Sequence, residues 1–346
     1  MATLSVCVAG ERLAAPAPHG TTLHYCNAAT RRPVWKRQQL TRIAHSRRSG
    51  ACVPHAAAAE AQTAAPAAPP ASTTAALTYT SFEGNSFRVQ FRRTAINVLV
   101  DPWLVGKLTF GGLDFVYAGS KRAARPEAIG SIDQLAAQTD VIVLSQGIDD
   151  HAHRPTLQAL PKTIPVVASA AGAAVSRSLG FRTIYTLRPG QSLALLGGAL
   201  TVRATEGALV GPPWSQREIG VVLQENLSGG ERGASLYYEP HADYIAESVA
   251  SVAPVDVVVS PPCNQILMGY PLVKGASDTP ALLRLLRPRV YIPLNNAEFD
   301  QSGPLADMLV EEGSAAQMQA ALAADPQLAG VRVCVPAAAQ PMPVDL

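Results

Sequence analysis

Apolar and polar residues alternate over the first part of the chain that carries a clear pattern. Three runs, at 77–82, 86–91 and 95–101, either alternate in this way or are largely apolar, and short polar stretches separate them. A period of two is typical of strands with one buried face, and short polar turns join such strands into hairpins. We therefore predict an antiparallel meander, with Asp101 at the end of its last strand and Pro102 stopping the ladder.

From residue 129 onward, helical periods and short apolar runs follow one another. The predicted helices cover 131–138, 154–160, 170–179, 242–252, 279–286 and 314–323. The predicted strands cover 141–144, 166–168, 183–186, 192–196, 200–204, 220–224, 234–238, 255–260, 290–293 and 331–335. Strands followed by mixed elements thus occur twice along the chain. Two facing sheets with helices on their outer sides, an αββα sandwich of the α/β class, accommodate this order better than one doubly wound sheet.

The stretch 141–154 points most directly to chemistry. An apolar run ends at Leu144, and Asp149, Asp150, His151 and His153 then fall within five positions. A buried strand of an α/β sheet delivers functional groups at its C-terminal end. Carboxylates and imidazoles are the side chains that bind metal ions and transfer protons. We therefore predict a functional site directly after this strand.

A structural explanation of the same stretch is also available. An acidic residue can cap the N-terminus of the following helix, with His151 satisfied by local contacts. A cap accounts for one aspartate and leaves the rest of the cluster unexplained, so we favour a site. His153, two residues further on, is expected at the surface.

The first 59 residues differ in composition from the rest. They contain eight basic residues, one acidic residue (Glu11) and no continuous apolar run of a secretory signal. This composition is typical of an organelle transit peptide, disordered by itself, and we expect delivery to the plastid (chloroplast) stroma, with the mitochondrion as the alternative. A basic arm that contacts nucleic acid is the other interpretation. Residues 60–76 are rich in Ala and Pro and are expected to form a linker, which leaves 77–346 as the folded domain.

Removing the leader changes what the composition excludes. The remaining chain carries 20 basic and 25 acidic residues, and a net negative charge argues against a nucleic-acid partner. Of the five cysteines only Cys263 and Cys334 remain, too few for a disulfide framework, and Cys263 is expected to be a buried thiol. No apolar run approaches the ~20 residues of a membrane span. We expect a small-molecule substrate as the partner.

These features together resemble the metallo-β-lactamase superfamily. The meander that ends in L-V-D-P-W at 99–103, and the buried strand that runs into S-x-x-x-x-D-H at 145–151, follow the order of elements in that family. Its members carry H-x-H-x-D-H at this strand end, and Asp150 and His151 match the last two residues of the motif. The resemblance implies an αββα sandwich of the metallo-β-lactamase type over most of the domain.

The resemblance also implies which metal ligands are kept. One metal of the family is held by three histidines, and here Gln146 and Ile148 replace two of them, while the loop 205–208 has no third. The second site is partly retained. Its implied ligands are Asp150, His151, His241 in place of an aspartate, and Asn295 or Asn296 in place of a histidine. Such a mixed set of oxygen and nitrogen ligands can hold one Zn²⁺, Mn²⁺ or Fe²⁺ with a position open for water.

Two functions follow from this interpretation. The first is a metal-dependent hydrolase acting on a small ester, thioester, lactone or phosphate-containing substrate through a metal-activated water, with Asp150 and Glu239 as catalytic carboxylates. The second is a metal-free, non-catalytic relative that acts as a binding or assembly protein in the plastid. Gln146 and Ile148 favour the second function, and the acids and histidines at strand ends favour the first. Glu239 and His241 are as compatible with a helix cap and an exposed histidine as with a site.

Overall fold

The computed structural model describes residues 22–23, 75–210, 214–294, 296 and 298–346. The predicted leader and linker therefore lie outside the described residues except at 22–23 and 75–76, and both remain predictions. No helix in the described ranges has the length and apolar character needed to cross a membrane.

The first sheet contains the predicted meander. Its order is β20-β2-β3-β4-β6-β7-β8, antiparallel from β20 to β4 and parallel from β4 to β8. The strands are β2 (Leu77–Ser81), β3 (Phe87–Phe91), β4 (Asn97–Val100), β6 (Val141–Leu144), β7 (Val166–Ala168), β8 (Ile184–Thr186) and β20 (Pro341–Val344). The meander is confirmed. The prediction missed β20 because two prolines argue against a strand, and β20 lies at the sheet edge, where proline is tolerated.

The second sheet has the order β1-β9-β10-β11-β12-β13-β16-β19. It is antiparallel from β9 to β12 and parallel from β12 to β19, and β1 pairs with β9 in parallel. The strands are β1 (Thr22–Leu23), β9 (Ser192–Leu195), β10 (Leu200–Glu206), β11 (Ile219–Asn226), β12 (Arg232–Tyr238), β13 (Val257–Ser260), β16 (Val290–Pro293) and β19 (Arg332–Val333). Short 3₁₀ turns, η1 (Leu196–Gly198) and η2 (Ser228–Gly230), lie between β9 and β10 and between β11 and β12.

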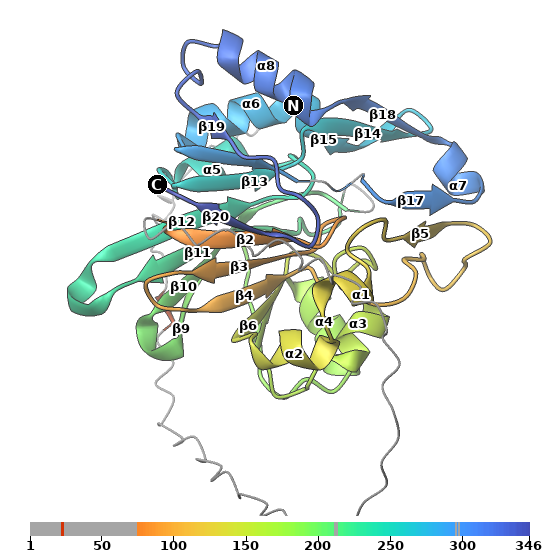
Figure 1. Cartoon of the computed structure of the whole chain (residues 1–346), viewed down its shortest axis with the longest axis horizontal. Helices are drawn as coiled ribbons and strands as arrows, with labels where there is room; N and C mark the ends of the chain where they lie inside the picture. The colour runs from red at the N-terminus through yellow and green to blue at the C-terminus, as the bar shows by residue number, and fades with distance from the viewer. Residues whose placement is uncertain (1–21, 24–74, 211–213, 295, 297) are drawn as a thin grey trace, which may run out of the picture.

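Helices cover the outer face of each sheet (Figure 1). The first sheet carries α2 (Ile132–Ala137), α3 (Arg154–Ala159) and α4 (Ala170–Ser178), and the second carries α5 (Ala246–Ala250), α6 (Gly275–Leu286) and α8 (Ala315–Ala324). Successive residues of β4 alternate between two hydrophobic clusters. Val98 and Val100 join the cluster between the sheets, and Leu99 joins the cluster beneath the helices, as expected for a strand buried on both faces. The predicted αββα sandwich is confirmed.

Two small sheets extend from one end of the sandwich, and the sequence pattern did not predict them (Figure 1). One consists of β14 (Cys263–Leu267), β15 (Tyr270–Lys274) and β18 (Leu309–Gly313), and the other of β5 (Ala118–Ser120) and β17 (Asp300–Ser302). Short helices α1 (Pro126–Ile129) and α7 (Pro304–Asp307) lie in the same parts of the chain. Most of these strands pair with partners far away in the sequence, so no local pattern reveals them.

Candidate functional site

The ends of four strands bring polar residues together at one edge of the sandwich. Asp101 follows β4, His151 comes after β6, His241 after β12 and Asn296 after β16. The Nδ1 atom of His151 lies 2.7 Å from Asp101 Oδ2, and the Nε2 atoms of His151 and His241 lie 3.3 Å apart. The structure therefore brings together residues that are far apart in the sequence, as predicted for this fold.

His151 is completely buried, and Asp101 holds its ring in place. The Nδ1–H of His151 donates to Asp101 Oδ2, because a carboxylate can only accept. The hydroxyl of Tyr238 donates to the same oxygen over 2.8 Å, and the backbone N–H of Ser145 donates to Asp101 Oδ1 over 2.8 Å. Asp101 has a left-handed backbone with φ of 41°, a conformation that non-glycine residues seldom adopt. This network directs Nε2 of His151 outward from the sheet.

His241 is oriented in the same way by a different partner. Its Nδ1–H donates over 2.9 Å to the carbonyl oxygen of Leu272, which lies on β15. The rings of His151 and His241 stack with their centroids 5.4 Å apart. Each ring thus keeps Nδ1 on a protein acceptor and turns Nε2 towards the other ring. The two Nε2 atoms thus face one another within the polar groups of the site.

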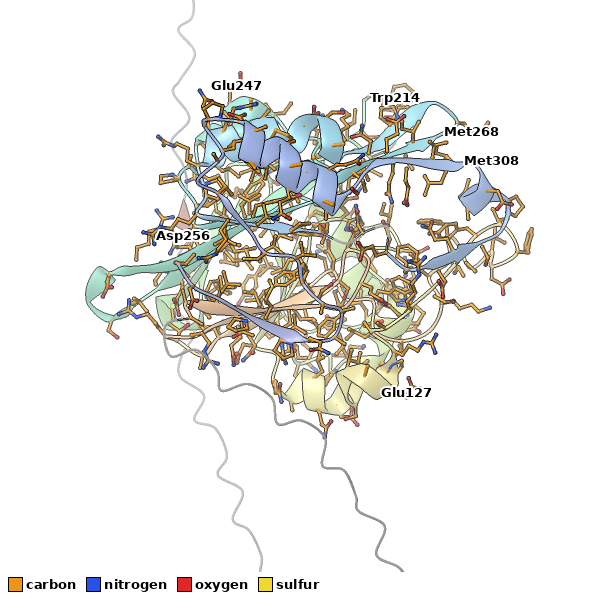
Figure 2. All side chains as sticks on the ribbon, turned by 45° about the horizontal axis from the view of Figure 1, so that its top comes forward. Glu127, Trp214, Glu247, Asp256, Met268 and Met308 are labelled. Atoms are coloured by element: carbon orange, nitrogen blue, oxygen red, sulfur yellow. The ribbon has the colours of Figure 1, made fainter. Side chains whose placement is uncertain are left out.

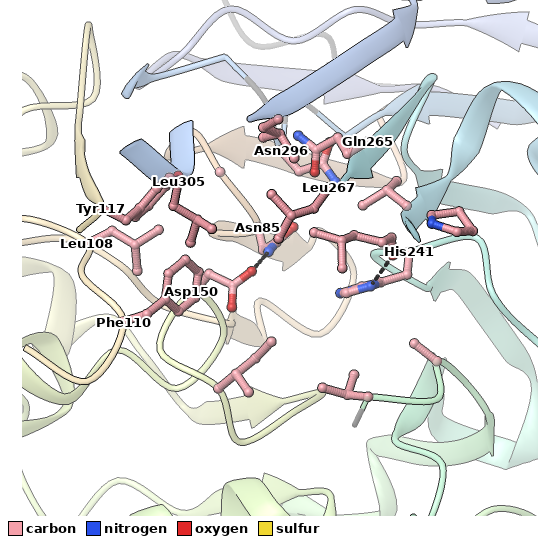
Figure 3. Close-up of a pocket in the computed structure, with 18 of the residues that line it drawn as sticks. Asn85, Leu108, Phe110, Tyr117, Asp150, His241, Gln265, Leu267, Asn296 and Leu305 are labelled. Atoms are coloured by element: carbon pink, nitrogen blue, oxygen red, sulfur yellow. Dashed lines mark hydrogen bonds between the residues drawn. The ribbon is translucent and has the colours of Figure 1, made fainter. Parts of the chain in front are cut away.

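Asp150 and Asn85 complete the polar cluster, a name used from here on for Asn85, Asp101, Asp150, His151 and His241. Asp150 Oδ2 accepts from Asn85 Nδ2 over 3.1 Å (Figure 3) and lies 3.3 Å from His151 Nε2, while Asp150 Oδ1 is buried without a partner. Asn85 Nδ2 is also 3.2 Å from His151 Nε2. Sequence reasoning missed Asn85, because an asparagine after Gly84 in a hairpin turn is fully explained as a turn residue.

Charges within the polar cluster follow from its burial. Desolvation disfavours a charged imidazole, but the carboxylates of Asp150 and Asp101 outweigh it and raise the pKa of His151 to about 10. Burial and the neighbouring charge of His151 lower the pKa of His241 to about 4. Burial opposes ionisation of Asp150 as well, yet His151 and His241 hold the pKa of Asp150 below its usual value. In the absence of a metal ion, these shifts favour a proton on His151, beside the carboxylates of Asp101 and Asp150.

Glu239, predicted as a catalytic carboxylate, lies under the loop that carries His241. It is fully buried, and its Oε2 accepts from the backbone N–H groups of His241 and Asp243 over 3.2 and 3.1 Å. Burial, followed by the charge of Asp243, raises the pKa of Glu239 to about 8. These contacts give Glu239 a role in shaping the loop. Its catalytic role remains a prediction.

The expectation that His153 lies at the surface is wrong. His153 is 2 % exposed, and its Nδ1 accepts from the backbone N–H of Thr156 at the start of α3. Its Nε2–H donates to the carbonyl oxygen of Lys107 over 3.1 Å. The helix cap that could have explained the aspartates is thus supplied by His153. Asp149 instead accepts from the backbone N–H of Gly111 over 3.0 Å.

The other positions that the sequence singled out are Asn295, Asn296, Gln146, Ile148 and Cys263. Asn295 lies outside the described residues, and its predicted ligand role remains a prediction. Asn296 is buried, and its amide donates to Pro240 O over 3.2 Å. At the positions of the missing histidines, Ile148 lines a cavity, and Gln146 is buried with neither amide atom hydrogen-bonded. Cys263 is a buried, free thiol, as predicted.

Two features bear on whether the polar cluster fits a metal ion. Across the described residues, no set of three or more His, Cys, Asp or Glu side chains stands ready to hold one. The His151 and His241 Nε2 atoms, 3.3 Å apart, nevertheless have the spacing of two ligands bound at ~2.1 Å to one tetrahedral ion. Their Nδ1–H groups have protein acceptors, as in ligating histidines. The residues therefore fit one divalent ion once His151 loses its proton and Asn85 turns away from Asp150.

A cavity of about 540 Å³ opens over the polar cluster (Figure 3). Asp150 and His241 form part of its lining, next to Asn85 and Asn296. Most other lining residues are apolar. A pocket of this size that contains a few converging polar groups is the usual form of a small-molecule site.

The family model described as "Beta-lactamase superfamily domain" matches residues 78–295, more than half of the chain. The chain belongs to the metallo-β-lactamase superfamily. Solved structures of hydrolases share its fold.

Three solved structures show the shared fold. An isothiocyanate hydrolase from Delia radicum gut bacteria is 17% identical, with a TM-score of 0.53 over 77% of this chain and 98% of that one. A possible metal-dependent hydrolase from Veillonella parvula is 16% identical, with a TM-score of 0.54 over 78% and 100%. Igni18, a metallo hydrolase from Ignicoccus hospitalis, is 14% identical, with a TM-score of 0.50 over 78% and 99%. A search of curated proteins found no significant match.

Proposed function

We propose that this protein is a hydrolase that holds one divalent metal ion, Zn²⁺, Mn²⁺ or Fe²⁺, between Asp150, His151 and His241. Its substrate is a small ester, thioester, lactone or phosphate-containing molecule. The observation that carries the proposal is the pair of Nε2 atoms that face one another 3.3 Å apart beside the cavity. Two histidines and one carboxylate are a common ligand set of catalytic zinc and iron sites.

The protein's own groups would prepare this site in distinct ways. A divalent ion lowers the pKa of a water molecule and polarises a substrate carbonyl or phosphoryl oxygen. Asp101 and the carbonyl oxygen of Leu272 keep the protons of both histidines on Nδ1, so that Nε2 can ligate. Asp150 contributes the negative charge. Glu239 fixes the loop of His241, and Asn295 is a further candidate ligand.

The rival function is a metal-free binding or assembly protein. Its support comes from Gln146 and Ile148, which cannot replace two histidine ligands, and from the proton that balances the carboxylates around His151. In that case the polar cluster would stabilise the fold, and the cavity would hold a ligand without chemistry.

Metal analysis of the purified full-length chain separates the two functions. After incubation with Zn²⁺, Mn²⁺ or Fe²⁺ and removal of free ions, the hydrolase proposal expects about one ion per chain. Asp150→Ala and His241→Ala should each lose the ion. The matched control is Asp149→Ala, because Asp149 is the neighbouring carboxylate and bonds to Gly111. A folded wild type that takes up none of these ions would favour the binding protein.

We further propose that the first 59 residues direct import into the plastid stroma. The support is their basic, acid-poor composition. A fusion of residues 1–76 to a fluorescent reporter should accumulate in the stroma. A reporter found in mitochondria, the cytosol or the secretory pathway would contradict the proposal.

A further inference from the structure

The wall of the cavity over the polar cluster is unusually apolar. Its side chains come from three separated parts of the chain, the loop before β5, the β14–β15 hairpin and the region from 299 to 309. We use the name apolar wall for Leu108, Phe110, Tyr117, Leu267, Tyr270 and Leu305. Figure 3 shows Leu108, Phe110, Tyr117, Leu267 and Leu305 grouped around Asp150. The wall therefore contacts any molecule that reaches the polar cluster.

Several polar side chains of the cavity lining pair within the protein, whereas Asn85 Oδ1, Asp150 Oδ1 and Asn296 Oδ1 are buried without a partner. Lys274 Nζ pairs with Asp243 Oδ1 over 3.1 Å, and the hydroxyl of Tyr117 donates to Gln301 over 3.0 Å. Gln265 donates to Glu311 over 3.3 Å. These pairs leave hydrocarbon as the main surface that the cavity offers to a ligand.

Charge in the lining disfavours an anionic ligand. Among its described residues, Lys274 is the one Lys or Arg, and it pairs with Asp243, which also pairs with Arg217 over 2.9 Å. Asp150 and Asp243 are both carboxylates. Apart from an ion held at the polar cluster, a phosphate group in the cavity would meet no unpaired Lys or Arg in the lining. It would lie beside the carboxylates of Asp150 and Asp243, which is unfavourable for an anion.

The mouth of the cavity is apolar as well. Phe110 is 37% exposed and Tyr270 58% exposed. Met268 and Met308 flank paired residues of β14 and β18 and are also exposed, and they lie beside one another in Figure 2. Exposed apolar side chains gathered at a cavity entrance are typical of a surface that binds an apolar ligand.

We propose that the cavity binds the apolar acyl chain of a carboxylic ester or thioester and selects against phosphate-containing substrates. This inference rests on the proposed hydrolase function and narrows its substrate class. In the reaction, the oxygen of water bonds to the acyl carbon, the C–O or C–S bond breaks, and the alcohol or thiol leaves with one proton. The products are a carboxylic acid and that alcohol or thiol, and no oxidant or reductant is needed.

Substrates that share one leaving group test the proposal. The full-length chain, loaded with Zn²⁺, Mn²⁺ or Fe²⁺ in separate samples, is assayed with p-nitrophenyl acetate, butyrate, hexanoate and octanoate, and with p-nitrophenyl phosphate and bis(p-nitrophenyl) phosphate. Each added methylene that becomes buried should raise kcat/KM about three- to fourfold. The phosphate esters should be hydrolysed far more slowly than the octanoate. Equal rates for all acyl chains, or faster hydrolysis of either phosphate ester, would overturn the acyl assignment and leave the hydrolase function intact.

A charge placed in the apolar wall gives the matched test. Leu267 is half-buried at the end of β14, so Leu267→Glu introduces a carboxylate into the cavity. The ratio of kcat/KM for octanoate to that for acetate should fall at least tenfold. Leu196→Glu makes the same exchange at a leucine that is 43% exposed and does not line the cavity, and it should leave the ratio unchanged. If Leu267→Glu fails to fold, Tyr270→Ser takes its place. This variant changes an exposed residue at the mouth of the cavity and should also lower the ratio of kcat/KM for octanoate to that for acetate.

A binding measurement separates failure of the inference from failure of the proposed function. If no ester is hydrolysed with any metal, the hydrolase function fails. Saturation-transfer NMR on the same samples then measures the binding of octan-1-ol. This measurement shows whether the cavity binds an apolar chain. Binding that Leu267→Glu abolishes and Leu196→Glu preserves would support an apolar-chain site, and absence of octan-1-ol binding would overturn it.

Discussion

The polar cluster and the apolar wall face the same cavity and are built in opposite ways. The cluster stands at the ends of sandwich strands, where His151 and Asp101 are completely buried and hydrogen-bonded. The wall comes from loops and accessory strands, and Phe110 and Tyr270 are exposed to solvent. Buried charge is costly unless it is paired, whereas exposed hydrocarbon costs little stability and can adapt to a ligand. The comparison indicates that reactivity depends on the sandwich and substrate choice on its additions.

The most damaging test of this comparison is His151→Gln in the metal-free chain. The change leaves Asp101 buried and Asp150 partly buried without a cation, so we expect the free energy of unfolding to fall by about 3–5 kcal/mol, measured by urea denaturation. His153→Gln alters an equally buried histidine that acts as a helix cap, and it should cost only about 1–2 kcal/mol. Equal losses of unfolding free energy in the two variants would contradict the prediction that His151 stabilises the fold by pairing with the carboxylates of the polar cluster.

Asp101→Asn should have the next largest effect, on the affinity for the proposed metal. The variant keeps the shape of the side chain but weakens the acceptor that holds the Nδ1 proton of His151. Changes of this kind next to a ligating histidine lower metal affinity about 10- to 100-fold. Competition with a chromophoric chelator measures the change. Asp256→Asn, a control carboxylate that accepts from Ser235 elsewhere in the second sheet, should bind the metal like the wild type.

The pH dependence of stability tests the charge of the polar cluster. The folded-state pKa of His151, about 10, lies above its ordinary value of 6.5. Its contribution is therefore fully present below about pH 6.5 and is lost as the pH rises towards 10. Lys121 acts in the opposite direction, because burial lowers its pKa to about 7, so the wild type must be compared with His151→Gln. The stability difference between them should shrink from pH 6.5 to 10, by at most ~1.4 kcal/mol per pH unit. A constant difference would contradict the protonated histidine.

The smallest expected effect belongs to the rim of the wall. Met268 is 81% exposed, and Met268→Ser should change the free energy of unfolding by no more than about 0.5 kcal/mol in thermal or urea denaturation. A loss above ~2 kcal/mol would mean that the accessory strands support the sandwich, and the contrast between cluster and wall would disappear.

Several parts of this arrangement could be predicted from local sequence. The continuous apolar run of β6 and the alternation of β2 and β3 revealed strands, because burial on one or two faces leaves a direct pattern. Asp150 and His151 stood out because charged residues immediately follow a buried strand. Asp101 was predicted at a strand end, and His241 was an implied ligand of the family's second metal site. Glu239 was predicted as a catalytic carboxylate. In the structure its side chain accepts hydrogen bonds from the backbone N–H groups of His241 and Asp243 and so supports the loop.

Other features depended on contacts between distant residues. Asn85 has the sequence signal of a turn, and its approach to Asp150 appears only when β2 and β3 pack beside β4 and β6. His153 looked like a surface residue because no local pattern reports the carbonyl oxygen of Lys107. The accessory strands β5, β17 and β18 escaped prediction because they are short and pair across long sequence separations, and the local β14–β15 hairpin was missed as well.

The sequence by itself determined the order of strands and helices, the twofold αββα pattern and the position of the acids and histidines at a strand end. All of these depend on local periodicity, which burial imposes on neighbouring residues. Only the tertiary structure decided that the pKa of His151 is raised and that of His241 lowered, because a pKa depends on burial and on the charges that surround it. The tertiary structure also decided that hydrocarbon surrounds the polar cluster, since the loop before β5, the β14–β15 hairpin and residues 299–309 line one cavity although they lie far apart in the sequence.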